Sequence, residues 1–161
     1  MTRIKKTIKQ KGGGTLIALT IFILFPFSAH ANILAGRIIE LTNQQRIQAK
    51  LPPLKPNPRL MKSAMLKAED ILKNKYWAHV SPSGVKPWYW LDKAKYNYSY
   101  AGENLAKDWD KDTDVIKAWL ASEEHKKNII NKNYLQIGVA VVEGIVDKKP
   151  TILVVEHFGA E

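Results

Sequence analysis

Cysteine is absent from the 161 residues of the chain. Without cysteine the chain has neither disulfides nor thiolate metal ligands, so its stability depends on an apolar core. With 45% hydrophobic residues, 161 residues are enough for one domain with such a core. If a domain of this size is exported without disulfides, it is more typical of bacteria than of small secreted eukaryotic proteins.

The sequence signatures of several enzyme classes are also missing. The chain has no G-x-x-x-x-G-K-[S/T] phosphate loop, no G-x-G-x-x-G dinucleotide motif and no H-E-x-x-H zinc motif. Internal repeats and low-complexity linkers are missing as well. These absences leave no signature of a nucleotide-dependent enzyme or a zinc protease of that class.

A long uncharged run occurs once, near the N-terminus. Residues 16–27 read LIALTIFILFPF, and they follow a basic segment without any acidic residue. The run is shorter than the about 20 residues of a membrane-spanning helix, and Ser28-Ala29-His30-Ala31 ends in an A-x-A pattern. We therefore predict a signal peptide over residues 1–31, cleaved after Ala31. An uncleaved N-terminal membrane anchor is the alternative.

Cleavage changes the charge of the chain. The whole chain carries +10, from 25 basic and 15 acidic residues, and five of the basic residues precede residue 12. The remainder carries about +5, with scattered lysines that are typical of a solvated surface. This predicts a secreted, periplasmic or cell-envelope protein. A lipid, a glycan or an envelope protein is then a better candidate partner than nucleic acid.

Hydrophobic periodicity predicts helices in the first part of the chain. An amphipathic helix is predicted from Leu34 to about Lys50, ending before two prolines. Asn57-Pro58 is an N-cap followed by proline at the first helical position. The apolar stripe of this second helix is predicted to comprise Leu60, Met61, Ala64, Met65, Ala68, Ile71 and Leu72.

The rest of the chain has a different character. Residues 76–100 hold eight of the 11 Trp and Tyr residues, which predicts an ordered connection with one short helix over Pro87–Ala94. Another helix is predicted from Asp112, followed by a turn or short helix over 122–130. The apolar runs 135–144 and 151–158 are predicted to be buried antiparallel strands. Helices followed by strands indicate an α+β domain.

Histidines and a few polar residues are the candidates for chemistry. His79, His125 and His157 are the only histidines after the leader. Two histidines with a nearby carboxylate are the minimum for an open metal site. The same histidines could instead act as general acid and base, or they could be structural residues. His157 is interpreted as a strand residue with a polar face rather than a ligand.

Glu103 and Ser122 each have two interpretations. Glu103 either faces a ligand or accepts backbone N–H bonds in its loop. Ser122 is either the N-cap of the 122–130 turn or, with His125 and Glu103, a nucleophile. Asn104 is expected to satisfy backbone groups beside Glu103.

Five motifs in a fixed order resemble the CAP superfamily of cysteine-rich secretory proteins, antigen 5 and pathogenesis-related proteins, in its cysteine-free bacterial branch. They are H-x-S-P-x-G (79–84), G-E-N-L-A (102–106), W-x-x-S-x-x-H (119–125), I-G-V-A (137–140) and H-F-G (157–159). Asn43-x-x-Arg46 followed by L-P-P-L (51–54) also resembles the start of this domain. The resemblance runs from about residue 34 to 159 and implies a single CAP domain over 32–161, folded as a three-layer α-β-α sandwich with an antiparallel central sheet.

The resemblance also implies a central cleft lined by two histidines and two acidic residues. His79, Glu103 and His125 match three of these positions, whereas Ser122 stands at the second acidic one, with Glu123 and Glu124 beside it. We therefore predict ligand binding by His79, Glu103, Asn104 and His125, with Zn²⁺ or another divalent metal held by His79 and His125 as a further option. The predicted function is an envelope binding module. The alternative is a metal-assisted or serine-type hydrolase that uses His79, Glu103, Ser122 and His125.

Overall fold

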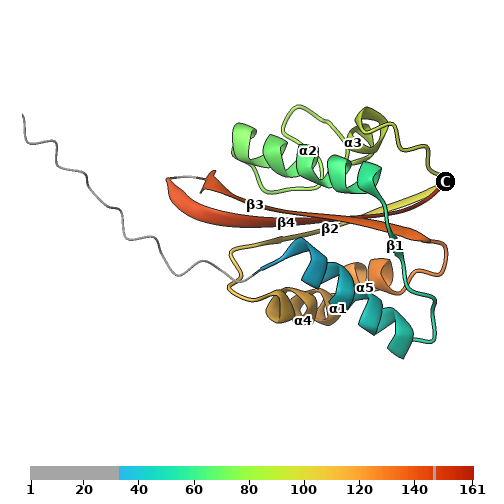
Figure 1. Cartoon of the computed structure of the whole chain (residues 1–161). Helices are drawn as coiled ribbons and strands as arrows, with labels where there is room; N and C mark the ends of the chain where they lie inside the picture. Colours follow the sequence, from blue (N-terminus) through green and yellow to red (C-terminus); the bar gives the residue numbers. More distant parts are fainter. Residues whose placement is uncertain (1–32, 147) are drawn as a thin grey trace, which may run out of the picture.

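The computed structural model describes residues 33–146 and 148–161, so the predicted signal peptide lies outside the described residues. Five helices and four strands are interspersed along these residues, and the chain ends with two consecutive strands (Figure 1). The helices are α1 (Ala35–Gln48), α2 (Pro58–Asn74), α3 (Trp88–Lys93), α4 (Asp112–Ala121) and α5 (Glu123–Ile129). The strands are β1 (Lys55–Pro56), β2 (Tyr100–Lys107), β3 (Gln136–Val146) and β4 (Lys149–Ala160).

The four strands form one sheet in the order β1-β3-β4-β2. Strands β2 and β3 both pair with β4 in antiparallel fashion, while the two-residue β1 runs parallel to β3. Helices α2 and α3 cover one face of the sheet, and α1, α4 and α5 cover the other (Figure 1). This confirms the predicted α+β three-layer sandwich, with a short parallel edge strand as the one departure from an antiparallel sheet.

Helix α2 begins as predicted. The side chain of Asn57 accepts hydrogen bonds from the backbone N–H groups of Arg59 and Leu60, and Pro58 occupies the first helical position. The predicted stripe needs one correction, because Met61 and Met65 are exposed while Ser63 and Lys67 are buried. Two polar side chains therefore lie on the buried face of the helix, where Ser63 contacts His157 of β4 and Lys67 donates to the carbonyl oxygen of His79 in the following loop.

Helix α2 lies very close to the sheet at Gly138. A Cβ at this position would collide with the backbone of Leu60 and Met61. Only glycine permits this approach, because it has no side chain. The contact brings Ser63, one turn further along α2, against His157 of β4.

Buried Arg46 connects the end of α1 to the far end of the α5 segment. Its guanidinium donates hydrogen bonds to the carbonyl oxygens of Pro52, Ile129, Asn131 and Tyr134 at 2.8–3.3 Å. Five donors in a rigid fork suit this arrangement, which lysine could not reproduce. Desolvation by burial lowers the pKa of Arg46 from its ordinary value.

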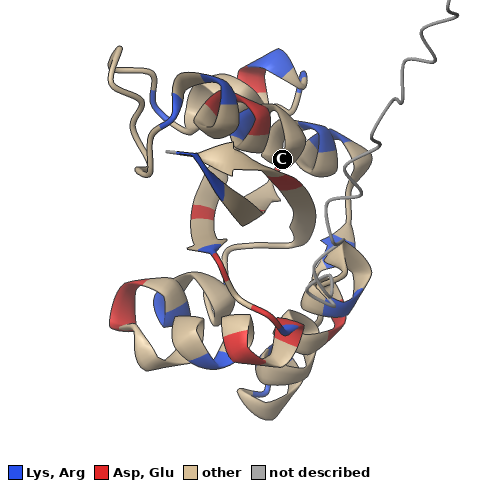
Figure 2. Ribbon diagram, turned by 90° about the vertical axis from the view of Figure 1, so that its left-hand side faces the viewer, with Lys and Arg blue, Asp and Glu red and all other residues tan. Residues whose placement is uncertain are grey.

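The surface carries charges of both signs. In the view of Figure 2, Lys and Arg residues are interspersed with Asp and Glu residues over the helices. Among the described residues, no helix is both long and apolar enough to cross a membrane.

Candidate functional site

The candidate site is built on the edge strand β2, which the sequence analysis did not predict as a strand. Residues 100–107 pair with β4 on one side, and the other side of β2 is an open edge of the sheet. Three carbonyl oxygens of β2 are covered by side chains instead of a further strand. The acceptors Ala101, Glu103 and Leu105 receive hydrogen bonds from Tyr134, Asn128 and Trp119, at 3.1, 3.1 and 3.0 Å. These side chains protect the edge and hold β2 in place.

Successive side chains of β2 point to opposite faces of the sheet. Glu103 therefore points to the α2 layer and Asn104 to the layer of α1 and α5. Gly102 has no room for a side chain, because a Cβ there would collide with the hydroxyl of Tyr134.

The carboxylate of Glu103 lies between two histidines. Its Oε1 is 2.6 Å from Nδ1 of His79, and its Oε2 is 2.9 Å from Nε2 of His157. Burial alone would raise the pKa of Glu103, but the hydrogen bonds from His157 and His79 and the charges of His157 and Lys67 outweigh burial and lower it. Glu103 is thus an ionised carboxylate in a buried position, with both oxygens engaged.

The second of these histidines, His157, is fully buried inside the sheet-α2 interface. Its Nδ1 lies 2.7 Å from Oγ of Ser63, which is itself 2.8 Å from the carbonyl oxygen of Leu60. The prediction of a strand residue with a polar face is confirmed, and the polar neighbours Ser63 and Glu103 are buried with it. Sequence reasoning missed Ser63 altogether. The available signal was the position of Ser63 on the apolar face of the predicted helix, three residues after Leu60 and next to Ala64.

The loop that carries His79 is anchored by the buried Lys67. Its ammonium group donates hydrogen bonds to the carbonyl oxygens of Ala78 and His79, at 3.0 and 2.7 Å, and to the hydroxyl of Tyr76 at 3.0 Å. Desolvation lowers the pKa of Lys67, against the opposite effect of the carboxylates of Glu103 and Asp70. All three ammonium protons have an acceptor, which makes the buried cation tolerable.

On the other face of β2, Asn104 belongs to a second buried network. Its amide nitrogen lies 3.3 Å from the carbonyl oxygen of His125 and 3.2 Å from Oε2 of Glu156, and its oxygen accepts from Asn128 at 2.9 Å. Asn104 thus binds one backbone group, as expected, but that group belongs to His125 in α5 rather than to the segment of Glu103, and its other partners are side chains. Burial raises the pKa of Glu156 to about 8, although bonds from Thr42 and Asn104 act in the opposite direction.

His125 and Ser122 lie at the α4–α5 junction. The imidazole of His125 is 6.5 Å from the ring of Trp119, and burial together with the charge of His79 lowers its pKa. Ser122 is the N-cap residue of α5 by position, but its side chain makes no capping hydrogen bond. Glu123, which could have replaced the missing acid, is exposed and pairs with Lys127 at 2.9 Å.

The described residues do not fit a metal centre with three or more protein ligands. No such group of His, Cys, Asp or Glu side chains is found between residues 33 and 161, residue 147 aside. His79 uses Nδ1 for Glu103, which leaves Nε2, and His125 adds a second imidazole without a third ligand. Structural and catalytic zinc sites use four and three protein ligands, respectively.

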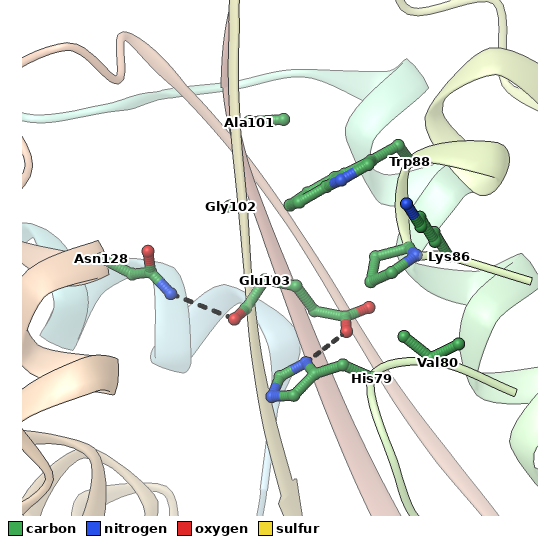
Figure 3. A pocket seen from close by; sticks show the side chains of 9 residues that line it. His79, Val80, Lys86, Trp88, Ala101, Gly102, Glu103 and Asn128 are labelled. Atoms are coloured by element: carbon green, nitrogen blue, oxygen red, sulfur yellow. Dashed lines mark hydrogen bonds and ion pairs between the residues drawn. The ribbon is translucent and has the colours of Figure 1, made fainter.

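A pocket of about 570 Å³ opens beside Glu103 (Figure 3). Its apolar lining consists of Val80, Pro87, Trp88 and Ala101, and its polar lining of His79, Lys86, Glu103 and Asn128, with Gly102 between them. Half of the His79 side chain is exposed, at 51%, against 2% for Glu103. His79 is therefore the member of the pair that a ligand can reach. Lys86, Trp88 and Asn128 were not predicted as site residues.

Comparisons with known proteins agree with this architecture. Residues 39–158 match the model of the cysteine-rich secretory protein family, CAP. The Bacillus subtilis protein YkwD is 40% identical over 107 residues, which is 66% of this chain and 42% of YkwD. The Bacillus subtilis membrane protein YlbC is 30% identical over 105 residues, 65% of this chain and 30% of YlbC. The chain thus spans less than half the length of the curated relatives it matches.

Solved structures share the fold. An extracellular SCP-domain protein of Bacillus anthracis superposes with a TM-score of 0.68 at 28% identity, over 79% of this chain and 40% of that protein. An outer surface protein of Borrelia burgdorferi gives the same TM-score at 23% identity, over 78% of this chain and 91% of the other. These findings confirm the resemblance seen in the sequence: the chain belongs to the cysteine-rich secretory protein (CAP) family, in its cysteine-free bacterial branch.

Proposed function

We propose that this chain is an exported binding module of the bacterial cell envelope, which holds a glycan in the pocket beside Glu103. Export is supported by the apolar segment at residues 16–27 and its A-x-A motif. The extracellular and outer surface proteins that share its fold support the same location. The ligand class is argued from the pocket itself.

The observation that carries the proposal is the double engagement of Glu103. A general base works best when its pKa lies near the working pH and when an oxygen is free to take a proton. Glu103 has both oxygens engaged by His79 and His157, and its pKa is lowered. The carboxylate is a weak base with a fixed orientation, which suits recognition better than proton transfer.

The pocket lining favours a glycan over a lipid. An acyl chain would place hydrocarbon against the free ring nitrogen of His79 and the ammonium group of Lys86, and burial of a polar group without a hydrogen bond costs about 1–3 kcal/mol. A sugar pairs its hydroxyl groups with the polar side chains and lays its apolar face against the Trp88 ring. The volume of about 570 Å³ is also that of a small-ligand pocket rather than a protein interface.

The serine-type hydrolase has no support from the described residues. Ser122 makes no hydrogen bond through its side chain to His125 or Glu103, so no base activates it. Ser63, His157 and Glu103 do have the order of a catalytic triad, with contacts of 2.7 and 2.9 Å. However, Ser63 and His157 are fully buried, and a substrate carbonyl does not reach the serine oxygen.

Calorimetric titration of the purified protein with tri-N-acetylchitotriose tests the proposal. We expect saturable binding that weakens at least tenfold in Trp88→Ala and measurably in Lys86→Met. Trp109→Ala is the matched control, because this exposed tryptophan lies outside the pocket lining. The Lys86→Met variant keeps the test decisive if Trp88→Ala unfolds. Absence of binding, or equal binding by both pocket variants, overturns the proposed function.

A further inference from the structure

We infer that Glu103 fixes the tautomer of His79 and leaves its Nε2 as an unprotonated hydrogen-bond acceptor, so that the pocket selects ligands that present a hydroxyl or amide N–H donor at this point. The inference concerns the chemistry of the pocket and rests on the proposed function for the identity of the ligand. Its first half, the tautomer, concerns the protein alone.

The first step is the protonation state of the acceptor. An ionised carboxylate has no proton to donate, so every hydrogen bond to it must come from the other partner. Both contacts of Glu103 are with ring nitrogens, Nδ1 of His79 at 2.6 Å and Nε2 of His157 at 2.9 Å. Both nitrogens therefore carry a proton.

The second step follows from the chemistry of neutral imidazole. One ring nitrogen is a donor and the other an acceptor, and the partner of the first decides which is which. With the proton of His79 on Nδ1, its Nε2 bears the free lone pair. Figure 3 shows Nδ1 directed at Glu103 and the second ring nitrogen directed away from it. No hydrogen-bond partner for Nε2 occurs among residues 33–146 and 148–161.

The third step is the rigidity of the carboxylate. Glu103 cannot rotate away from His79 without breaking its bond to the buried His157, which is held from behind by Ser63. Oγ of Ser63 lies within hydrogen-bonding distance of both Nδ1 of His157 and the carbonyl oxygen of Leu60. It can therefore donate to a neutral His157, or accept from a charged one while donating to Leu60. Ser63 and His157 are positioning residues for the acceptor on His79.

The ligand must therefore present a hydrogen-bond donor to Nε2 of His79. The polar groups of the lining that have no partner within the described part of the protein are then the acceptor Nε2 of His79 and the ammonium group of Lys86. A sugar hydroxyl or an N-acetyl N–H satisfies His79, whereas an ether oxygen at the same place leaves two lone pairs facing each other.

Long-range ¹H–¹⁵N correlation spectra of the histidine rings test the tautomer without any ligand. At about pH 8, above the ordinary pKa of histidine, we expect His79 to show protonated Nδ1 and bare Nε2. His157 is expected to carry its proton on Nε2 when neutral, or on both nitrogens. His125, which makes no ring hydrogen bond, is the internal control and should show the mixture of tautomers found in free histidine. In Glu103→Gln, the pattern of His79 should shift toward that of His125. A wild-type His79 with its proton on Nε2, or on both nitrogens, overturns the inference.

Binding of tri-N-acetylchitotriose and of its permethylated form tests the ligand requirement. The two probes share ring faces and acceptor oxygens, but the permethylated one has lost its donors. We expect at least tenfold weaker binding of the permethylated probe to the wild-type protein. Equal binding of both probes overturns the donor requirement and leaves the glycan proposal standing. Binding of neither probe contradicts the glycan proposal, while the spectra still decide on the tautomer.

Discussion

Glu103 and His157 lie directly opposite each other on the antiparallel strands β2 and β4, and their side chains meet with 2.9 Å between Oε2 and Nε2. The pair connects the core of the domain to its pocket, since His157 is fully buried and Glu103 also contacts the half-exposed His79. The orientation of the pocket carboxylate thus depends in part on His157, which is buried beyond the reach of a ligand.

Replacement of His157 by leucine should destabilise the fold. The change leaves Oε2 of the buried Glu103 carboxylate without its partner, and removal of one member of a buried pair costs about 3–5 kcal/mol. Urea denaturation at neutral pH measures this loss. His125→Leu is the matched control, because His125 is half-buried without a ring hydrogen bond, and it should change the free energy of unfolding by less than about 1 kcal/mol.

The loss of unfolding free energy in His157→Leu should depend on pH. A carboxyl whose folded-state pKa is lowered, as at Glu103, contributes stability above its unfolded pKa, and this contribution is lost as the pH falls through the folded value. The difference in unfolding free energy between the wild type and the variant should therefore become smaller as the pH falls. A difference that grows below about pH 4 contradicts an ionised Glu103.

Glu156 is expected to make the protein less stable as the pH rises. Its pKa is raised to about 8 in the folded protein, against an ordinary value of 4.5. Between these values the folded state holds one proton more than the unfolded state, so stability falls by about 1.4 kcal/mol per pH unit. Glu156→Gln cannot ionise and should lose much of this slope in thermal unfolding scans from about pH 5 to 8. The exposed Glu69→Gln should keep the wild-type slope.

Gly138→Ala and Gly36→Ala should change stability in opposite directions. A methyl group at residue 138 pushes α2 away from the sheet, and overpacking of this kind costs about 1–3 kcal/mol or more. At residue 36, in the first turn of α1, a Cβ meets nothing within 4 Å. Alanine there should stabilise the helix by up to about 1 kcal/mol. Chemical denaturation of both variants checks the sign, and equal effects would disprove the close approach of α2 to β3.

Lys67→Met should loosen the loop that carries His79. The variant keeps the length of the side chain but loses the three hydrogen bonds to Tyr76, Ala78 and His79. We expect faster amide hydrogen exchange over residues 78–80 and weaker glycan binding, with helix content retained. Lys62→Met, an exposed position on the same helix, should leave exchange unchanged. Unaltered exchange in Lys67→Met would show that the loop is held by other contacts.

Much of the fold could be predicted from local sequence patterns. Asn57-Pro58 marks the start of α2 through capping chemistry, and the β-branched runs near residues 140 and 154 predict β3 and β4. Each of these signals acts within a few residues of chain. The family resemblance added His79 and Glu103, and the structure places these two in contact.

Other features depend on contacts between distant segments and left no local signal. Strand β2 contains Gly102 and Asn104, which have low strand propensity, and it forms because β4 pairs with it 54 residues away at Glu103 and His157. The exposed Met61 and Met65 show the same limit, since periodicity alone did not reveal that polar Ser63 and Lys67 have buried partners. Ligand binding by His79, Glu103, Asn104 and His125 stays a prediction.

The most direct test of the account is an NMR map of the glycan site. Titration of the ¹⁵N-labelled protein with tri-N-acetylchitotriose should shift the indole N–H of Trp88, the amide of Gly102 and the side-chain amide of Asn128, all of which line the pocket. The indole of Trp109 should not move. Shifts confined to Trp109 and other residues away from Glu103, or no shifts at millimolar glycan, would contradict the central claim that this pocket binds the ligand.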